Sequence, residues 1–313
     1  MNRPSASNPN PNPNPNPNPG PSLKFELCLL AMLALLWGSS YLLIKIAVAD
    51  IPPVTLIAAR VSIAAVFLLA VLAWQRAPLP SDAATWGKLF IQSVFTAIGA
   101  WTLLAWGQQF VDSGLAGVLN STSPIFVFLI TALVMRGPSP GAWKFGGACL
   151  GLIGVTLIIG VDVLAGLGQQ VMAQLAVLLG AVLYACAAIY GRRFNHITPT
   201  ATAAGTMIWA AAMLVPLSLI IERPWTLQPS TASMLTAGGL GVFCTGVALL
   251  IYFRLVRTLG SMETASQSYL RSGVSVALGV IVLGEQITPV VGAGLACAIL
   301  GVAAINYRPR AKP

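Results

Sequence analysis

The sequence predicts an all-α membrane protein with ten transmembrane helices, arranged as two inverted five-helix repeats. Hydrophobic residues make up 57% of the 313-residue chain and charged residues only 8%, and the mean hydropathy is +0.82. Soluble globular domains carry about 25% charged residues. Apolar runs of about 20 residues, long enough to cross a bilayer as a helix, recur along the chain. A single shift superimposes its two halves.

The runs lie at about 25–47, 53–74, 88–110, 114–135, 143–161, 171–191, 199–221, 235–256, 262–283 and 288–307. They are continuously apolar and do not alternate, which predicts helices and not β-barrel strands. Because they use nearly the whole chain, no room remains for a soluble catalytic domain.

The two ends of the chain differ from the rest. Residues 1–24 carry a Pro-Asn repeat that cannot bury apolar surface, so we expect a disordered, Pro/Asn-rich cytoplasmic tail. This stretch lacks the basic start and cleavage site of a signal peptide. Residues 308–313 form a short basic tail, also expected in the cytoplasm.

The net charge of +9 is distributed unevenly. With the N-terminus inside, thirteen of the seventeen basic residues fall in inside stretches, whereas the outside loops carry only Arg223. The positive-inside rule therefore predicts that both termini are cytoplasmic, in a multi-pass protein of the cell inner (plasma) membrane. The charge sets the topology and does not indicate a nucleic-acid partner.

A shift of 147 residues lays the first half on the second without gaps. Gly137, Gly147 and Gly154 fall on Gly284, Gly294 and Gly301, Ser121 falls on Ser268, Trp37 on Tyr184 and Lys45 on Arg192. Each half, 25–161 and 171–307, then holds five helices, and an odd number inverts the second half in the membrane. Inverted repeats are typical of transporters that hold a substrate near the bilayer midplane.

Several motifs carry a family resemblance: "LLWGSSYLLIK" (Leu35–Lys45), "AAR" (Ala58–Arg60), "LNSTSPIF" (Leu119–Phe126), "GGACLGLIGV" (Gly146–Val155) and "LGEQIT" (Leu283–Thr288). Over about residues 25–307 the chain resembles the EamA-type repeats of the drug/metabolite transporter superfamily, and within it the YddG-type amino-acid exporters. The resemblance implies a central cavity among helices 1–4 and 6–9, with helices 5 and 10 to the side. Two positions depart from the family pattern. Arg271-Ser272 replaces the usual acidic residue and proline, and Gly137-Pro138 replaces the usual Gly-Glu.

Residue types that carry catalysis are missing from the predicted membrane core. The sequence has no Ser/His/Asp set, nucleotide loop or metal cluster, so we expect no enzyme activity, no cofactor and no metal. The five cysteines lack metal-type spacing and predict no disulfide. All eight acidic residues fall at or near helix ends, whereas a proton or sodium carrier usually holds a carboxylate at depth. This pattern favours a facilitator, or an exporter driven by the substrate's own gradient.

Arg271 is the most informative residue, because it lies about 14 Å into the helix that begins near Met262. Facing lipid there would cost at least about 2.5 kcal/mol. Thr264, Ser268 and Ser275 recur with it at helical spacing, so this polar stripe is expected to line an aqueous cavity. Either Arg271 binds a substrate carboxylate through paired N–H donors, or it bonds carbonyls of a neighbouring helix and only shapes the cavity.

Other residues are candidates for the same cavity because they are polar or aromatic and lie within predicted helices. They are Gln267, Trp37, Tyr41, Trp101, Gln108, Asn120, Tyr184 and Arg60, with Pro124 as a hinge. Ordinary packing is the alternative for each aromatic residue, and for Arg60 a structural pairing is favoured over contact with the substrate. Lys45 is expected to be a snorkelling anchor near Asp50. Aromatic walls around an embedded cation suit a zwitterionic or anionic molecule with an apolar side chain.

Glycine runs in 143–161 and 288–307 permit close helix contact. Packing inside each half is favoured over a dimer interface, which leaves a monomer as the expected state.

Taken together, the sequence predicts a secondary transporter that exports amino acids, aromatic or otherwise apolar, and related small metabolites by alternating access. Its partners would be the amino-acid substrate and the lipid bilayer. A carrier of phosphorylated metabolites or nucleotide sugars is the alternative within transport, although more clustered cations would be expected. A non-transporting structural or receptor protein is the alternative of another class, and it would not require inverted duplication.

Overall fold

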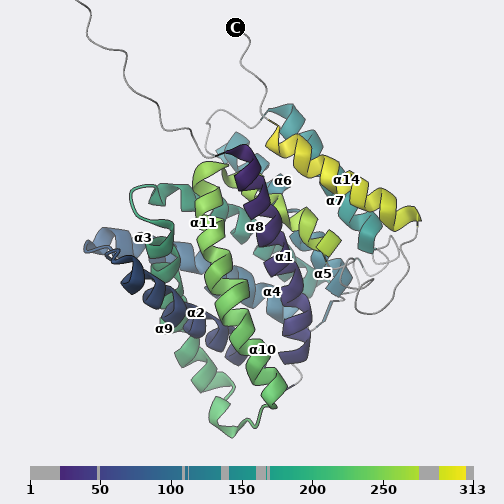
Figure 1. Ribbon diagram of the computed structural model, residues 1–313. Helices are drawn as coiled ribbons and strands as arrows, with labels where there is room; N and C mark the ends of the chain where they lie inside the picture. Colours follow the sequence, from purple (N-terminus) through teal and green to yellow (C-terminus); the bar gives the residue numbers. More distant parts are fainter. Residues whose placement is uncertain are drawn as a thin grey trace, which may run out of the picture.

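The computed structural model is helical throughout its regular structure (Figure 1). It describes residues 22–47, 50–107, 110–111, 113–134, 141–159, 167, 170–274 and 289–307, and no strand occurs among them. The predicted tails at 1–24 and 308–313 lie almost wholly outside this part of the chain, as does Gln108.

In the first half, α1 (Leu23–Ala47) and α2 (Pro53–Gln75) are single helices. The third expected segment is α3 (Ala83–Ser93), the π-helix η1 (Val94–Trp101) and α4 (Thr102–Gly107) in succession. The fourth is α5 (Ser113–Asn120), α6 (Ser123–Leu129) and the π-helix η2 (Ile130–Val134), and the fifth is α7 (Ala142–Ile159).

The second half begins with α8 (Val171–Gly191), the short 3-10 turn η4 (Arg192–Phe194) and α9 (Pro199–Ile221), which the 3-10 turn η5 (Pro224–Thr226) follows. Then come α10 (Thr231–Gly241), the π-helix η6 (Val242–Val247) and α11 (Ala248–Thr258). The chain continues through α12 (Ser261–Ala265) and helical residues 267–274, and α14 (Pro289–Asn306) follows.

Eight helices within the described ranges are long and apolar enough to cross a membrane, and α7 is a shorter apolar helix over Ala142–Ile158. The chain is therefore a multi-pass membrane protein. The expected span at 262–283 is described only as far as Val274, so the total of ten spans stays a prediction.

Helix boundaries repeat between the halves under the same 147-residue shift. The shift carries α7 onto α14 residue for residue, and it carries η1 onto η6 to within one residue at each end. The apolar runs did not predict these π-helical turns, because one extra residue in a turn leaves an apolar run apolar. π-helical turns are rare and occur frequently at functional sites.

The main helix contacts join one half to the other. α7 packs along α14 and α2 along α9, while α1 packs on α10 and α11, and α8 on η1 and α4. Figure 1 shows α14, in yellow, lying beside α7 at one side of the molecule. The halves are therefore interleaved.

The glycine faces of α7 and α14 meet each other. A Cβ added at Gly154 would lie 2.7 Å from the Gly294 carbonyl oxygen, and one added at Gly301 would lie 2.7 Å from the Gly147 carbonyl oxygen. The expectation that these glycines pack inside each half was therefore wrong. They bring two backbones together across the halves, as small residues do in membrane helix pairs.

Acidic residues at helix ends fasten the same inter-half contacts. Glu26 accepts hydrogen bonds from Arg254 (2.8 Å) and Thr258 (2.9 Å), and Glu263 forms an ion pair with Lys144. At other helix ends, two carboxylates accept from groups at helix N-termini. The carboxylate of Asp50 accepts from Ser233 Oγ (2.7 Å) and from the backbone N–H of Ser230 (3.1 Å). The carboxylate of Glu222 accepts from the backbone N–H groups of Val54 (3.1 Å) and Thr55 (2.6 Å). The Lys45 side chain lies outside the described part.

Candidate functional site: a pocket between the two halves

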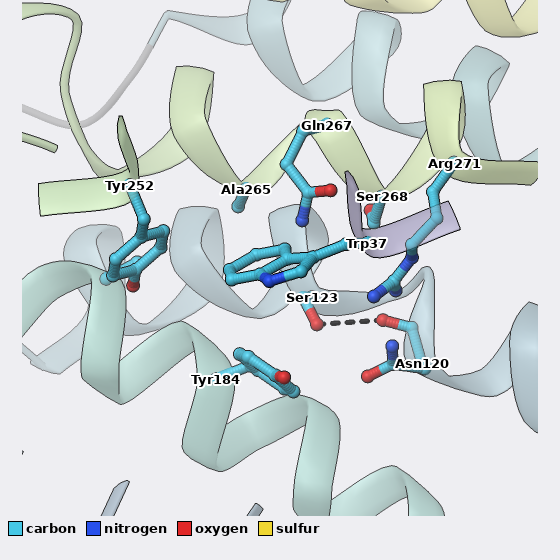
Figure 2. A pocket seen from close by; sticks show the side chains of 10 residues that line it. Trp37, Asn120, Ser123, Tyr184, Tyr252, Ala265, Gln267, Ser268 and Arg271 are labelled. Carbon is cyan, nitrogen blue, oxygen red and sulfur yellow. Dashed lines mark hydrogen bonds between the residues drawn. The ribbon is translucent and has the colours of Figure 1, made fainter. Parts of the chain in front are cut away.

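A pocket with an empty volume of about 330 Å³ lies where the two halves meet (Figure 2). Its walls come from α1, α5, α6, α8, α11, α12 and helical residues 267–274. The lining residues are Trp37, Asn120, Ser123, Tyr184, Ala188, Tyr252, Ala265, Gln267, Ser268 and Arg271.

Equivalent residues of the two halves face this pocket together. The 147-residue shift relates Trp37 to Tyr184 and Asn120 to Gln267, and all four line the pocket. The other six lining residues have no equivalent in the lining; Arg271, for example, corresponds to Pro124, and Tyr252 corresponds to an alanine. Two positions of the pocket are thus duplicated, whereas its charge comes from the second half only.

Helix interruptions bring the two amides into the pocket. α5 ends at Asn120 and α6 begins at Ser123, whose Oγ donates a 2.8 Å hydrogen bond to the Asn120 carbonyl. Pro124 lies in the first turn of α6, where its missing N–H breaks no helical hydrogen bond. In the second half, α12 ends at Ala265 and Gln267 follows after one intervening residue. Whether Pro124 acts as a hinge stays a prediction.

Three aromatic rings form one wall of the pocket. The Trp37 ring lies 5.6 Å from that of Tyr252 and 6.3 Å, edge-on, from that of Tyr184, measured between centroids. Trp37 Nε1 donates a 3.0 Å hydrogen bond to the carbonyl of Cys244 in η6, which fixes the indole against the second half. The rings offer a rigid apolar surface of the kind that an aromatic or aliphatic side chain packs against.

Arg60 and Trp101 lie one layer behind this wall, outside the described lining. Arg60 Nη2 donates to the same Cys244 carbonyl at 3.0 Å, Nε donates to Thr245 Oγ1 at 2.5 Å, and the guanidinium stacks 4.5 Å above the Trp101 ring. Trp101 Nε1 in turn donates to the Tyr184 hydroxyl. The contacts give Arg60 a structural pairing, the interpretation that the sequence favours over contact with the substrate.

Arg271 brings a permanent charge into the pocket. The residue is 7% exposed, and Figure 2 shows its side chain reaching into the pocket toward Asn120. It is the only charged residue in the described lining. A guanidinium in this position can bind a carboxylate through two parallel N–H donors.

Four polar atoms of the lining are buried without a hydrogen-bond partner. They are Asn120 Oδ1, Gln267 Oε1, Ser268 Oγ and the Tyr252 hydroxyl. Leaving a buried polar group unpaired costs about 1–3 kcal/mol, so native proteins rarely gather several in one place. The pocket is therefore suited to a ligand that supplies their partners.

The structure groups most of the predicted site residues and adds others. Trp37, Asn120, Tyr184 and Gln267 join Ser268 and Arg271 around one pocket, whereas Gln108 and the Tyr41 side chain lie outside the described part. Tyr252 and Ser123 were missed. Ser123 stands beside Pro124 in a motif that had been noted, but the sequence around Tyr252 carries no polar stripe that would have singled it out.

Comparisons with known proteins agree with this architecture. The EamA-like transporter family matches the chain twice, over residues 24–160 and 171–307. The uncharacterized transporter YoaV of Bacillus subtilis is 28% identical over 270 residues, covering 84% of this chain and 91% of the relative. The uncharacterized inner membrane transporter YedA of Escherichia coli is 26% identical over 284 residues, covering 90% and 91%.

One solved crystal structure superimposes with a TM-score of 0.78 at 18% identity, covering 91% of this chain and 98% of that one, and so shares the fold. The resemblance to the EamA-type repeats is confirmed by the double family match. The chain belongs to the EamA-like transporter family and is a membrane transporter.

Proposed function

We propose that this transporter exports zwitterionic amino acids with aromatic or other apolar side chains. The proposal includes a ten-helix, inverted-repeat arrangement with repeats at 25–161 and 171–307, both termini in the cytoplasm, and a location in the cell inner membrane. The observation that carries it is the buried guanidinium of Arg271 in a pocket walled by three aromatic rings.

The pocket chemistry matches the parts of such a substrate. The planar guanidinium of Arg271 offers two parallel donors to a carboxylate, an arrangement that a point charge cannot reproduce. Trp37, Tyr184 and Tyr252 offer the apolar surface for the side chain. Substrates with an ionised carboxylate and a hydrophobic group therefore fit better than purely polar or purely apolar molecules.

The charge of the pocket favours a carboxylate over a phosphate. A phosphate monoester carries about −1.5 to −2 charges near neutral pH. The described lining supplies one cation, and Arg60 lies behind the wall with its N–H donors directed at Thr245 and the Cys244 carbonyl. A phosphorylated metabolite would be under-neutralised here, which disfavours the alternative carrier.

Alternating access follows from how the pocket walls are grouped. Trp37, Tyr252 and Arg271 lie on α1, α11 and residues 267–274, whereas Asn120 and Tyr184 lie on α5 and α8. α1 packs on α10 and α11, and α8 packs on η1, α4, α5 and α6, so the pocket lies between two helix groups, which also touch where α12 meets α6 and α8. Rocking of one group against the other would open the pocket to each face in turn.

Transport would be uncoupled from protons. No carboxylate or histidine occurs in the described lining, and described acids such as Glu26 and Glu222 lie in helix-end contacts. Proton-coupled carriers usually hold such a group at depth.

Purified protein in liposomes, tested with labelled amino acids and phosphorylated metabolites, examines the proposal. Aromatic amino acids should cross faster than in empty vesicles, and an imposed pH gradient should not drive accumulation. Arg271→Gln should lower transport at least tenfold, because it removes charged hydrogen bonds, and Arg271→Lys should restore it only in part. Arg193→Gln, at an exposed arginine of η4, is the matched control. Failure of every amino acid to cross would overturn the proposal.

A further inference from the structure

We propose that the side-chain amides of Asn120 and Gln267 form the ammonium-binding part of the pocket, so that the transporter distinguishes α-amino acids from the corresponding carboxylic acids without an amino group. This inference rests on the proposed function and assigns a specificity to two residues of the same pocket.

The two amides occupy equivalent positions in the two halves and share one unusual property. Asn120 is 2% exposed and Gln267 6% exposed, and the side-chain oxygen of each lacks a hydrogen-bond partner. In Figure 2 they enter the pocket from opposite sides, with the Arg271 guanidinium reaching in on the same side of the view as Asn120. Both unpaired acceptors therefore line the space that would receive the charged end of a substrate.

An unpaired acceptor needs a donor, and the pocket itself supplies none to these two oxygens. A carboxylate has only acceptors, so it can accept from the Arg271 guanidinium but cannot donate to the two amide oxygens. An α-ammonium has three N–H donors and sits one carbon away from the carboxylate of an amino acid. These N–H groups are the kind of donor that the unpaired acceptors of this lining need, and those acceptors are the two amide oxygens and Ser268 Oγ.

An electrostatic effect opposes this selectivity for amino acids. Arg271 is the only charge in the described lining, so Coulomb attraction alone would favour a monocarboxylate anion over a zwitterion of zero net charge. A carboxylic acid without the amino group would leave both amide oxygens buried against carbon. Hydrogen bonds to a charged group contribute more than neutral ones, and sites built around such bonds reject analogues that lack the donor. We therefore expect the two unpaired acceptors to decide the selectivity against the attraction of one cation.

The test compares labelled phenylalanine with labelled 3-phenylpropionate, which has the same ring and carboxylate but no amino group. In liposomes, the wild-type protein should transport phenylalanine at least tenfold faster. Gln267→Met and Asn120→Leu, which keep volume but remove the acceptor, should each lower phenylalanine transport about tenfold and change phenylpropionate transport less than twofold.

Gln92→Met is the matched control, since Gln92 is also a fully buried glutamine with an unpaired side-chain oxygen, but it lies in α3 away from the pocket lining. Its selectivity should equal that of the wild type. Equal wild-type rates for the two compounds would overturn the inference while leaving amino-acid transport intact. Transport of neither compound would overturn the proposed function itself. The wild-type measurement can overturn the inference even if a variant fails to fold, and unchanged selectivity in both folded variants would overturn it as well.

Discussion

Two matched helix pairs achieve the same packing with different chemistry. In the first pair, α1 packs on the segment formed by α10, η6 and α11. In the second pair, the equivalent helix of the other half, α8, packs on the equivalent segment of α3, η1 and α4. Polar contacts hold the first pair at three depths, through Glu26 with Arg254, Trp37 with the Cys244 carbonyl, and Asp50 with Ser230. The second pair has polar contacts too, from Gln92 Nε2 to the Ala187 carbonyl (3.2 Å) and from Trp101 Nε1 to the Tyr184 hydroxyl, but no ion pair joins its described residues. It also depends on close approach, since a Cβ at Gly180 would lie 3.3 Å from the Ala100 carbonyl oxygen.

The contrast shows that the two halves share the arrangement of these helices but not the side chains that hold them together. Position 33 in α1 is a buried leucine, and the equivalent position in α8 is Gly180. The first pair should therefore be sensitive to loss of charge, and the second to added volume.

The largest effect is expected from Gly180→Leu. The added side chain would press on the backbone of η1, and overpacking of this kind costs about 1–3 kcal/mol, with more where backbone must move. The measurement is the melting temperature of the purified protein in detergent. Gly238→Leu in α10 is the control, because nothing lies within 4 Å of its added Cβ. If the two variants lowered the melting temperature equally, the second helix pair would not be more sensitive to added volume than the first.

A smaller effect is expected from breaking the ion pair of the first helix pair. Glu26 is 1% exposed, but the side chain of Arg254 is 41% exposed, so solvent screens their interaction. A double-mutant cycle of Glu26→Gln and Arg254→Gln should give a coupling energy of about 1 kcal/mol in the free energy of unfolding. If the effects of the two substitutions on the free energy of unfolding simply add, the ion pair does not stabilise the fold.

The smallest effect concerns pH. Hydrogen bonds from Ser230 and Ser233 hold the pKa of Asp50, in the loop after α1, below its ordinary value of 3.8. A lowered folded-state pKa adds stability above the unfolded-state pKa, and this is lost as the pH falls through the folded value. Between about pH 5 and pH 3, the melting temperature of the wild type should fall more than that of Asp50→Asn.

Asp82→Asn is the comparison for this experiment. The pKa of Asp82 is also lowered, by hydrogen bonds from Thr85 in the same helix, so this carboxylate caps α3 without joining two halves. If Asp50 fastens α1 to α10, Asp50→Asn should also lower the melting temperature at neutral pH more than Asp82→Asn does. If Asp82→Asn lowered the melting temperature more than Asp50→Asn, the role of Asp50 in fastening α1 to α10 would be contradicted.

Much of the fold could be predicted because a bilayer imposes length and apolarity on each helix. The apolar runs predicted an all-helical membrane protein, and the repeat shift recurs in the family match. Helix faces could not be predicted in the same way, because lipid and protein interior are equally apolar and the helices lack a polar side to mark the surface. The misassigned packing of Gly154 and Gly301 follows from this.

The site was predictable where polarity stands out against that background. Arg271 and Ser268 were identified from a polar stripe, and Asn120 from a polar face shared with Pro124. Arg60 looks equally conspicuous in sequence, yet it packs behind the wall because the carbonyl of Cys244 and the hydroxyl of Thr245 in η6 receive its donors. The location of those acceptors depends on tertiary structure alone.

The glycine contact between α7 and α14 also limits when the fold can be completed during synthesis. α7 is synthesised with the first half, but its partner is the last helix described in the chain. The glycine face of α7 can therefore gain its partner only after nearly the whole chain has been made, so we expect this contact to be among the last to form.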